Sequence, residues 1–168
     1  YQTIYMVIDY KEFEKTRNNI GNKTIVCTSG FFDPIHPGHI SCIRESKKFG
    51  DILVVVLNGN NQCITKKGKP FIPAKDRAYI IDNLRDVDYV VTYDHPTKYD
   101  SCEALEIVKP HVFTKGGDRD EAKKVPEVEV VEKHGGRVEY NVGNPKVWSS
   151  SNYLEEWYQF RAKQEKKN

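Results

Sequence analysis

The segment Asp51–Leu57 reads DILVVVL, a nearly continuous run of apolar and mostly β-branched residues. A strand with one face in water alternates polar and apolar residues, whereas a continuous apolar run is typical of a strand buried on both faces. Such strands occur in parallel sheets that helices cover on both sides. This segment therefore constrains the chain to an α/β fold.

Strand and helix patterns alternate around this run. Short β-branched stretches predict four further strands, at Thr24–Ser29, Val87–Tyr93, His111–Thr114 and Arg137–Val142. Apolar residues at helical spacing predict helices at His39–Phe49, Ala74–Leu84, Ser101–Val108, Pro126–Lys133 and Ser149–Lys163. Five strands with intervening helices predict a Rossmann-like, doubly wound, five-stranded parallel sheet, with ligands bound outside the carboxyl ends of the strands.

The remaining stretches have less regular patterns. The first 23 residues are expected to form an accessory segment, with a strand or turn and a helix near Tyr10–Arg17, before a single domain at residues 24–168. A polar loop is expected at Asn58–Pro73. The last helix is expected to be amphipathic. Its apolar residues available for packing are Tyr153, Leu154, Trp157 and Phe160.

Composition excludes several classes of protein. The net charge of +2 comes from 26 basic and 24 acidic residues, and this balance argues against a dedicated nucleic-acid binder. The longest apolar run is far too short to cross a bilayer, and the N-terminus lacks the apolar core of a signal peptide, so no membrane partner is expected. Four widely spaced cysteines without a C-x-x-C pair favour reduced thiols in a cytoplasmic protein.

The segment Gly30–His39, GFFDPIHPGH, joins the first expected strand to the first expected helix. His36 and His39 are three residues apart, so they can face the same way if the helix begins near Pro37. Gly38 lets a phosphate approach the backbone, and the free N–H groups at the helix start favour an anion. Two imidazole donors beside an anion can stabilise charge that develops on phosphoryl oxygens, so this turn predicts phosphoryl chemistry.

The pattern Gly30-x-Phe32-Asp33-x-x-His36-x-Gly38-His39 resembles the G-x-F-D-x-x-H-x-G-H signature of the cytidylyltransferase-like nucleotidyltransferases. These proteins carry the H-x-G-H element on a Rossmann-like sheet, and the resemblance continues over nearly the whole chain. It implies that His36 and His39 are catalytic. It also implies nucleotide binding by Gly30, Phe31, Phe32, Asp33 and Gly38. A solvated helical turn and a zinc site are the alternatives, but no third zinc ligand stands nearby at suitable spacing.

The lysine-bearing segment before residue 74 resembles the family's mobile loop, which is followed by an arginine on the next helix. Lysines there can close over a triphosphate and neutralise it as pyrophosphate leaves, although a solvated basic loop is the alternative. Lys67 is thus expected to be catalytic, and Lys66 and Arg77 are expected to bind nucleotide. Family members commonly have Asp just after the second strand. Asn60 stands there in this chain, and we expect it to bind substrate without a charge.

Two later segments complete the expected site. Lys115, Gly116, Gly117 and Asp118 follow the fourth expected strand and resemble the K-G-G-D of heptose 1-phosphate adenylyltransferases, which implies nucleotide binding; a capped glycine turn is the alternative. Ser149, Ser150 and Ser151 open the last helix and resemble the family's S-[ST]-[ST] element. Hydroxyls and free N–H groups at a helix start can bind phosphates, although ordinary capping needs only one of the three.

The resemblance implies an enzyme that transfers the nucleoside monophosphate of ATP to a sugar phosphate and releases pyrophosphate, with Mg²⁺ bridging the triphosphate. The alternatives are a CTP-dependent cytidylyltransferase acting on glycerol 3-phosphate or a phospho-alcohol, and a nucleotide-binding module with weak catalysis. The stretch before the serines lacks the arginine that cytidylyltransferases place there, which favours ATP over CTP. A homodimer is expected because many relatives pair.

Overall fold

The apolar run forms β3 (Ile52–Asn58) at the centre of a parallel sheet, and the side chains of residues 53–57 are fully buried. The computed structural model describes residues 6–117, 125–145 and 147–168. β3 pairs with β2 (Ile25–Gly30) on one side and with β4 (Tyr89–Tyr93) on the other. Across the described ranges the sheet has six strands in the order β1-β4-β3-β2-β5-β6, and every pair is parallel.

The remaining elements flank this centre. The other strands are β1 (Val7–Asp9), β5 (Val112–Thr114) and β6 (Arg137–Glu139). The helices are the 3-10 turn η1 (Tyr10–Glu12), α1 (Phe13–Asn19), α2 (Pro37–Lys47), α3 (Asn60–Lys67), α4 (Ala74–Asp82), α5 (Cys102–Val108), α6 (Pro126–Lys133) and α7 (Ser150–Lys167). None of the helices in the described ranges combines the length and apolar character that a membrane span requires.

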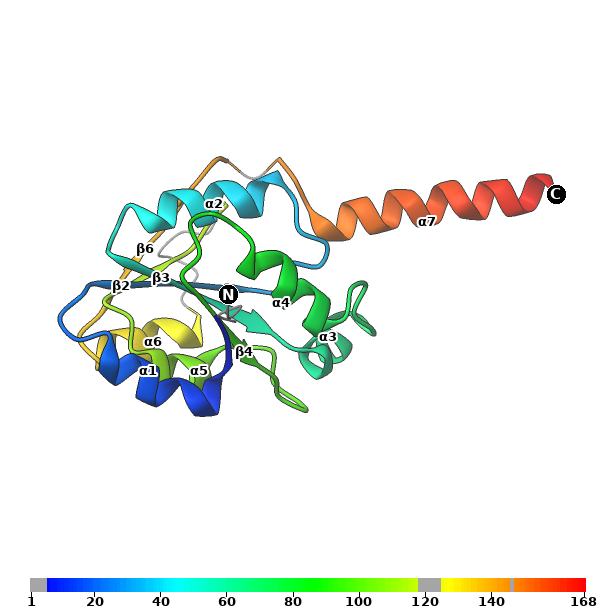
Figure 1. Cartoon of the computed structure of the whole chain (residues 1–168). Helices are drawn as coiled ribbons and strands as arrows, with labels where there is room; N and C mark the ends of the chain where they lie inside the picture. Colours follow the sequence, from blue (N-terminus) through cyan, green and yellow to red (C-terminus); the bar gives the residue numbers. More distant parts are fainter. Residues whose placement is uncertain (1–5, 118–124, 146) are drawn as a thin grey trace, which may run out of the picture.

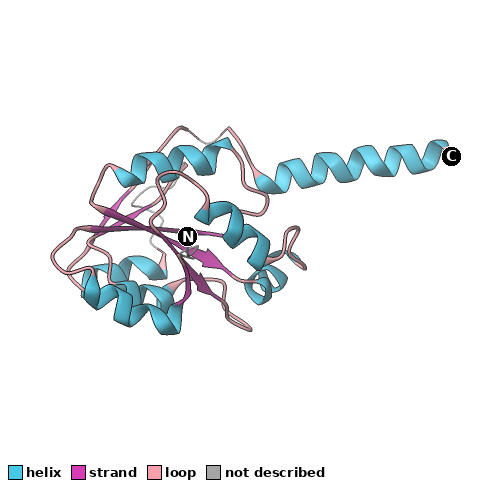
Figure 2. Cartoon of the chain, viewed as in Figure 1, coloured by secondary structure: helices cyan, strands magenta, loops and turns pink. Residues whose placement is uncertain are grey.

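Helices cover both faces of the sheet (Figures 1 and 2). α2 and α4 lie on one face, and α1, α5 and α6 lie on the other. Ile43 of α2 and Ile81 of α4 belong to the apolar cluster on the first face. Phe13 of α1, Leu105 of α5 and Val131 of α6 belong to the cluster on the second. The doubly wound α/β fold that the sequence predicts is therefore confirmed.

The chain reverses its direction of winding between β2 and β5, which are neighbours in the sheet. After β2 the chain winds outward through α2 to β3 and then to β4, and it returns through α5 on the opposite face to β5. Doubly wound sheets bind ligands at such a reversal, outside the carboxyl ends of the two strands. In this chain the turn after Gly30 and the turn after Thr114 meet at that position.

The prediction of five strands was wrong by one. The extra strand is β1, in which Val7 pairs with Val90 and Ile8 with Val91. The sequence analysis left this segment open as a strand or a turn, because a strand of three residues is too short to show a period. Phe13, which follows it, is fully buried, so the first segment contributes both a strand and a core residue.

Two other segments differ from the sequence expectations. The expected polar loop contains α3, in which Gln62 is fully buried and accepts the backbone N–H of Gly59 at 3.2 Å. α3 has few apolar residues, so its sequence carries no helical hydrophobic pattern. α7 is helical as predicted, but it extends away from the rest of the fold and has no buried residue. Its aromatic side chains therefore do not pack into the core.

We predict that Phe13→Ala lowers the free energy of unfolding by about 3–5 kcal/mol, because it leaves a cavity beneath α1. The Phe13 ring lies edge-on to Tyr89, with the ring centroids 5.8 Å apart. Urea denaturation followed by circular dichroism measures the loss. The matched control is Phe71→Ala, because Phe71 is 55% exposed, and it should change stability by less than about 0.5 kcal/mol. An unchanged urea midpoint for Phe13→Ala would show that the first segment does not stabilise the sheet.

Candidate active site

The turn between β2 and α2 is closed by two hydrogen bonds between its histidines. His36 is the N-cap of α2, and the backbone N–H of His39 donates to its Nδ1 at 3.3 Å. In return, the backbone N–H of His36 donates to Nδ1 of His39 at 3.2 Å. The two rings stack with their centroids 3.6 Å apart and their planes 16° from parallel. Pro37 occupies the first turn, where its missing N–H costs nothing, so the helix begins as predicted.

These hydrogen bonds fix where each imidazole carries its proton. A nitrogen that accepts a backbone N–H must have its lone pair available, so a neutral ring holds its proton on the other nitrogen. His36 and His39 therefore both carry the proton on Nε2. The stacked pair therefore carries one Nε2–H donor on each ring, and two such donors side by side can hydrogen-bond the oxygens of a phosphate group.

The ring of His39 stays neutral because of its surroundings. Burial lowers its pKa to about 3, and the neighbouring ring of His36 contributes to the shift. Phe32 packs edge-on against it, with the ring centroids 5.0 Å apart, and this apolar contact helps to exclude water. A neutral imidazole is suited to bind a phosphate that must later be released, because the ring keeps the same charge before and after the phosphate binds.

Two glycines in the turn are required by close contacts. A Cβ at Gly38 would lie 2.9 Å from Cε1 of His36 and 3.2 Å from Cε3 of Trp148. A Cβ at Gly30 would lie 3.1 Å from the ring of Phe32. The backbone φ of Phe32 is positive, at 50°. Gly38 therefore makes room for the ring of His36 itself, which is a use that the sequence analysis did not anticipate. The sequence analysis also did not predict a role for Trp148; its position just before the serine motif was the available signal.

Asp33 ties the turn to the segment after α3. Its buried carboxylate accepts the backbone N–H groups of Phe71 at 2.8 Å and Ile72 at 2.7 Å, and the ammonium of Lys67 lies 2.8 Å from its Oδ2. Burial alone would raise the pKa of this carboxyl, but the hydrogen bonds from Lys67, Phe71 and Ile72 outweigh it and hold the pKa below its usual value. Asp33 thus places Lys67 beside the turn, as expected, while its own oxygens are occupied by protein groups.

Arg77 is buried and linked to four segments. Its guanidinium donates at 2.7 Å to the carbonyl oxygens of Phe31, Asn58 and Ile72, and more weakly to Asn60 and Cys63. These contacts occupy all five of its donors, so the structure does not bring Arg77 to the surface of the site where it was expected. It acts on the site by holding the loops around it.

The neighbours of Arg77 lie nearer the surface. The side-chain oxygen of Asn60 accepts the backbone N–H of Ala74 at 2.8 Å, at the start of α4. Lys66 lies over the ring of Phe31, with its ammonium 4.3 Å from the ring centroid. Lys66 and Lys67 both belong to the last turn of α3. Two cations therefore lie on the side of the histidine turn where the sequence analysis expects phosphates.

The segment after β5 packs against α2. A Cβ at Gly116 would lie 2.9 Å from the sulfur of Cys42, and Gly117 has a positive φ of 73°. Lys115 is almost fully buried, with its ammonium 5.0 Å from the ring centroid of Phe113. Asp118, also expected to bind nucleotide, lies outside the described residues. The backbone of this segment is therefore held next to the helix that carries His39.

The serine motif contacts the turn directly. Ser149 is the N-cap of α7 and accepts the N–H of Asn152 at 3.3 Å, while its hydroxyl lies 3.0 Å from that of Ser151. The hydroxyl of Ser150 donates to the carbonyl oxygen of Pro34 at 2.7 Å. One serine thus caps the helix and another joins it to the histidine turn. The start of α7, with its free N–H groups, is held beside the two histidines.

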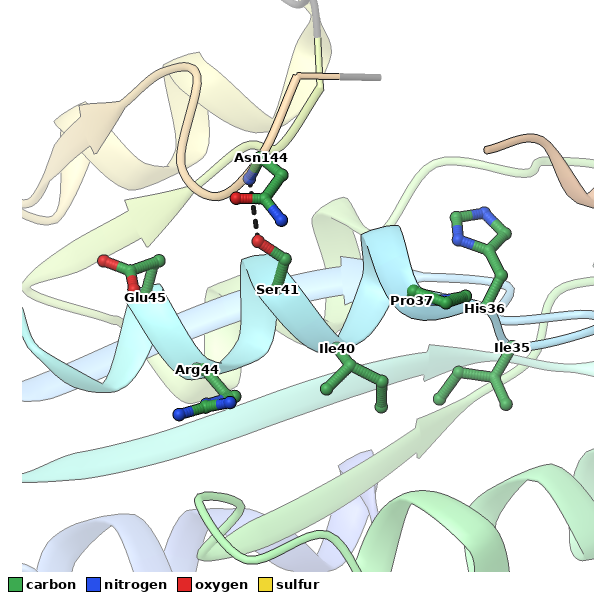
Figure 3. Close-up of a pocket in the computed structure, with 8 residues that line it drawn as sticks. All are labelled: Ile35, His36, Pro37, Ile40, Ser41, Arg44, Glu45 and Asn144. Carbon is green, nitrogen blue, oxygen red and sulfur yellow. Dashed lines mark hydrogen bonds between the residues drawn. The ribbon is translucent and has the colours of Figure 1, made fainter. Parts of the chain in front are cut away.

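A groove of about 710 Å³ runs along α2 from His36 (Figure 3). It is lined by Ile35, His36, Pro37, Ile40, Ser41, Arg44, Glu45 and Asn144. Ser41 and Asn144 are joined across its edge, where the backbone N–H of Asn144 donates to the Ser41 hydroxyl at 2.7 Å. The groove thus begins at the histidine turn and continues along α2.

Within the described ranges no group of three or more His, Cys, Asp or Glu side chains could hold a metal ion. Asp33, the buried carboxylate of the turn, is already paired with Lys67 and two backbone N–H groups. The described residues therefore offer anion-binding donors around the histidines and no cage for a cation built from protein.

The doubly wound sheet, the stacked imidazoles at the start of α2 and the lysines at the end of α3 are the features expected of a nucleotidyltransferase. Comparison with known proteins agrees: the chain belongs to the family described as Cytidylyltransferase-like, which matches residues 27–156. The resemblance drawn from the G-x-F-D-x-x-H-x-G-H pattern is thereby confirmed.

The chain is similar to several curated relatives. The bifunctional protein HldE of Aliarcobacter butzleri is 40% identical over 113 residues, which are 65% of this chain and 23% of the relative. The protein of the same name from Geotalea uraniireducens is 41% identical over 128 residues, 75% of this chain and 24% of the relative. The chain thus spans about a quarter of the length of these relatives.

Solved structures share the fold. A lipopolysaccharide core biosynthesis protein from Thermoplasma volcanium is 30% identical with a TM-score of 0.60, and the match covers 74% of this chain and 98% of that one. Pantoate-beta-alanine ligase from Francisella tularensis is 17% identical with a TM-score of 0.62, covering 90% of this chain and 73% of that one. At that identity the second match shows the fold alone.

We predict that His39 stays neutral, with its proton on Nε2, between about pH 5 and pH 8. Its folded pKa is about 3, whereas the ordinary value is 6.5, so the unfolded chain binds the extra proton first as the pH falls. The contribution of His39 to stability is therefore present above 6.5 and is lost as the pH falls toward 3. Nitrogen-15 NMR of the imidazole signals measures the protonation state, and a His39→Asn spectrum assigns the signal among the five histidines. A His39 titration near its ordinary pKa would contradict this.

Proposed function

We propose that the chain transfers the AMP unit of ATP to a sugar 1-phosphate, of the kind used in ADP-heptose synthesis, and releases pyrophosphate. The observation that carries the proposal is the stacked histidine pair, which presents two Nε2–H donors at a helix start. The similarity to bifunctional HldE proteins supports a sugar 1-phosphate as the acceptor of the AMP unit. The resemblance of residues 115–118 to the K-G-G-D of heptose 1-phosphate adenylyltransferases supports the same acceptor.

In this reaction a phosphate oxygen of the acceptor attacks the α-phosphorus of ATP, and the bond from that phosphorus to the bridging oxygen of the β-phosphate breaks. The acceptor phosphate is already anionic, so no base has to remove a proton and no covalent enzyme intermediate forms. Nε2–H of His36 and His39 would donate to the oxygens of the α-phosphate, where negative charge increases in the transition state. Catalysis then depends on the position of the two substrates and on hydrogen-bond donors that are fixed in place.

The leaving pyrophosphate would be held by the groups around the turn. Lys67 and Lys66 supply positive charge at the end of α3, and we propose that Lys67 moves from Asp33 to the β- and γ-phosphates when ATP binds. Asp33 would remain hydrogen-bonded to two backbone N–H groups after the exchange. The hydroxyl of Ser150 and the free N–H groups of α7 would complete the phosphate site.

Mg²⁺ belongs to the nucleotide in this proposal. Because the described residues offer no cluster of metal-ligating side chains, the ion would be bound mainly by the phosphates and by water, as Mg²⁺ commonly is in such sites. It would neutralise part of the triphosphate charge. We also propose a cytoplasmic location, because the four cysteines, all of them described, are free thiols in a chain that would consume ATP.

We predict that His39→Ala lowers kcat by about 10²–10³-fold, because it removes one of the two donors to the α-phosphate. Pyrophosphate release is measured with each of the four nucleoside triphosphates, paired with heptose 1-phosphate or glycerol 3-phosphate. The matched control is His134→Ala, since His134 pairs with Glu106 at the end of α6, away from the histidine turn, and should keep full activity.

The outcomes separate the candidate functions. Turnover of ATP with the sugar phosphate supports the proposal, whereas turnover of CTP with glycerol 3-phosphate would replace it with the cytidylyltransferase reading. Tight ATP binding without pyrophosphate release from any pair would indicate a binding module. Full activity of His39→Ala would remove the role assigned to the histidine pair.

A further inference from the structure

α3 carries two lysines of the expected phosphate site, yet it has almost no apolar anchor of its own. Gln62 and Cys63 are its buried residues, and its other residues are exposed. A helix this short is not stable in isolation, so contacts with other segments must hold it in place. The position of Lys66 and Lys67, in its last turn, therefore depends on what fixes this helix.

The first turn of α3 is capped from another strand. Its own N-cap, Gly59, has no side chain, and Asp94, just after β4, takes the place of one. The carboxylate of Asp94 accepts the backbone N–H of Asn61 at 3.3 Å and that of Gln62 at 3.1 Å. These are the second and third residues of the helix, whose N–H groups an N-cap side chain ordinarily binds. The side-chain amide of Asn61 adds a further hydrogen bond to Asp94 at 2.8 Å.

Gln62 completes the cap from the side of the helix. Its Oε1 accepts the backbone N–H of Gly59 at 3.2 Å, while its own backbone N–H donates to Asp94. In a capping box both exchanges occur between the N-cap residue and the third helical residue. In this chain the half that requires an N-cap side chain is supplied by Asp94 instead. The negative charge of Asp94 also lies at the positive end of the helix dipole.

The glycine at the N-cap is required by Asp94 and not by the backbone. Gly59 has φ −82° and ψ −175°, an extended conformation that any residue adopts. A Cβ at this position would lie 2.5 Å from Cβ and 2.6 Å from Oδ1 of Asp94. A side chain at 59 and the carboxylate at 94 therefore exclude each other, because they would fill the same space and bind the same N–H groups.

The segment that follows Asp94 holds a second side of α3. The side-chain amide of Gln62 donates to the carbonyl oxygen of Lys98 at 3.0 Å and to that of Asp100 at 2.9 Å. Because Gln62 is fully buried, these hydrogen bonds are shielded from water. The chain after β4 thus fastens α3 through polar contacts rather than through an apolar face.

We propose that Asp94 is a positioning residue, which caps α3 from β4 and thereby fixes Lys67 beside the histidine turn. At the other end of α3 the ammonium of Lys67 lies 2.8 Å from Oδ2 of Asp33. The cap itself is independent of any reaction, whereas its effect on catalysis rests on the proposed function. The alternative is that Gln62 and Cys63 hold the helix by themselves, in which case Asp94 would stabilise only the first turn.

Exchanging the two positions tests the cap by thermal unfolding, followed by circular dichroism. Asp94→Gly should lower the thermal midpoint by about 2–4 °C, the effect of losing one helix cap in a chain of this size. Gly59→Ser should also lower it, because its side chain has no room beside Asp94. The double variant should be more stable than either single variant, because the serine hydroxyl then accepts the N–H of Gln62 in the space that Asp94 leaves. A double variant whose two losses add would show that Asp94 is not the cap of α3.

The matched control is Asp9→Gly. Asp9 is likewise an exposed aspartate at the end of a strand, and it caps η1 by accepting the backbone N–H of Lys11 at 3.0 Å. The replacement is the same, but η1 carries no residue of the candidate site. Asp9→Gly should therefore leave kcat unchanged, and adding Gly59→Ser should not restore its stability.

Lys67→Ala tests whether the cap acts through the lysine. Asp94→Gly should lower kcat for pyrophosphate release by about 10–100-fold, because a displacement of about 1 Å at a site costs rates of this order. Gly59→Ser should restore most of that loss. In a Lys67→Ala background Asp94→Gly should have almost no further effect on kcat. An equal loss in both backgrounds would show that Asp94 acts by another route and would overturn the proposal.

Thermal midpoints separate this inference from the proposed function. A wild type that turns over no nucleotide would refute the proposed function, and the stabilities of Asp94→Gly, Lys67→Ala and their double variant would still decide the positioning claim. The two side chains act at opposite ends of an eight-residue helix, roughly 12 Å apart, so independent losses would add. We expect less than the sum, because uncapping α3 already separates Lys67 from Asp33. Additive losses would contradict the claim that Asp94 positions Lys67.

Discussion

Nδ1 of His36 and Nδ1 of His39 each accept a backbone N–H from the other residue, and the geometry of the site depends on this exchange. It closes the first turn of α2 and leaves Nε2 as the proton-bearing nitrogen of each neutral ring, so one pair of contacts has a structural and a chemical consequence. Gly38 leaves the space in which the ring of His36 lies, and Trp148 closes that space from outside. A larger residue at 38 would therefore displace the imidazole before it affected any ligand.

Around this pair, buried polar groups hold loops that have little apolar surface of their own. Asp33 joins the turn to the segment after α3, and Arg77 joins four segments through its five donors. A buried charge left without partners is costly, so each of these residues strongly favours one arrangement of its loops. The site is thus positioned by a polar frame beneath it, and Lys67 is held against that frame by its ion pair with Asp33.

The sequence predicted the parts of the molecule whose signal is local. DILVVVL identified the central strand, and the spacing of His36, Gly38 and His39 identified the start of α2. The remainder depends on tertiary contacts that no local pattern records. β1 is too short to show a period, and α3 is helical although it is polar.

Two further differences show the same limit. An arginine at position 77 suits both ligand binding and a buried structural role, and only the structure shows that its donors face carbonyl oxygens. The pattern of α7 correctly gave an amphipathic helix but not what its apolar side contacts. An amphipathic pattern predicts that the apolar face of a helix is covered. The pattern is equally compatible with a cover from the protein's own core and with a cover from a second molecule.

The most direct measurement of the central claim is a crystal structure with an ATP analogue whose α–β bridging oxygen is replaced by a methylene group. The account predicts that Nε2 of His36 and Nε2 of His39 each lie within about 2.7–3.2 Å of oxygens of the α-phosphate. Phosphates bound away from the stacked pair, or imidazoles turned so that Nδ1 rather than Nε2 faces them, would contradict it.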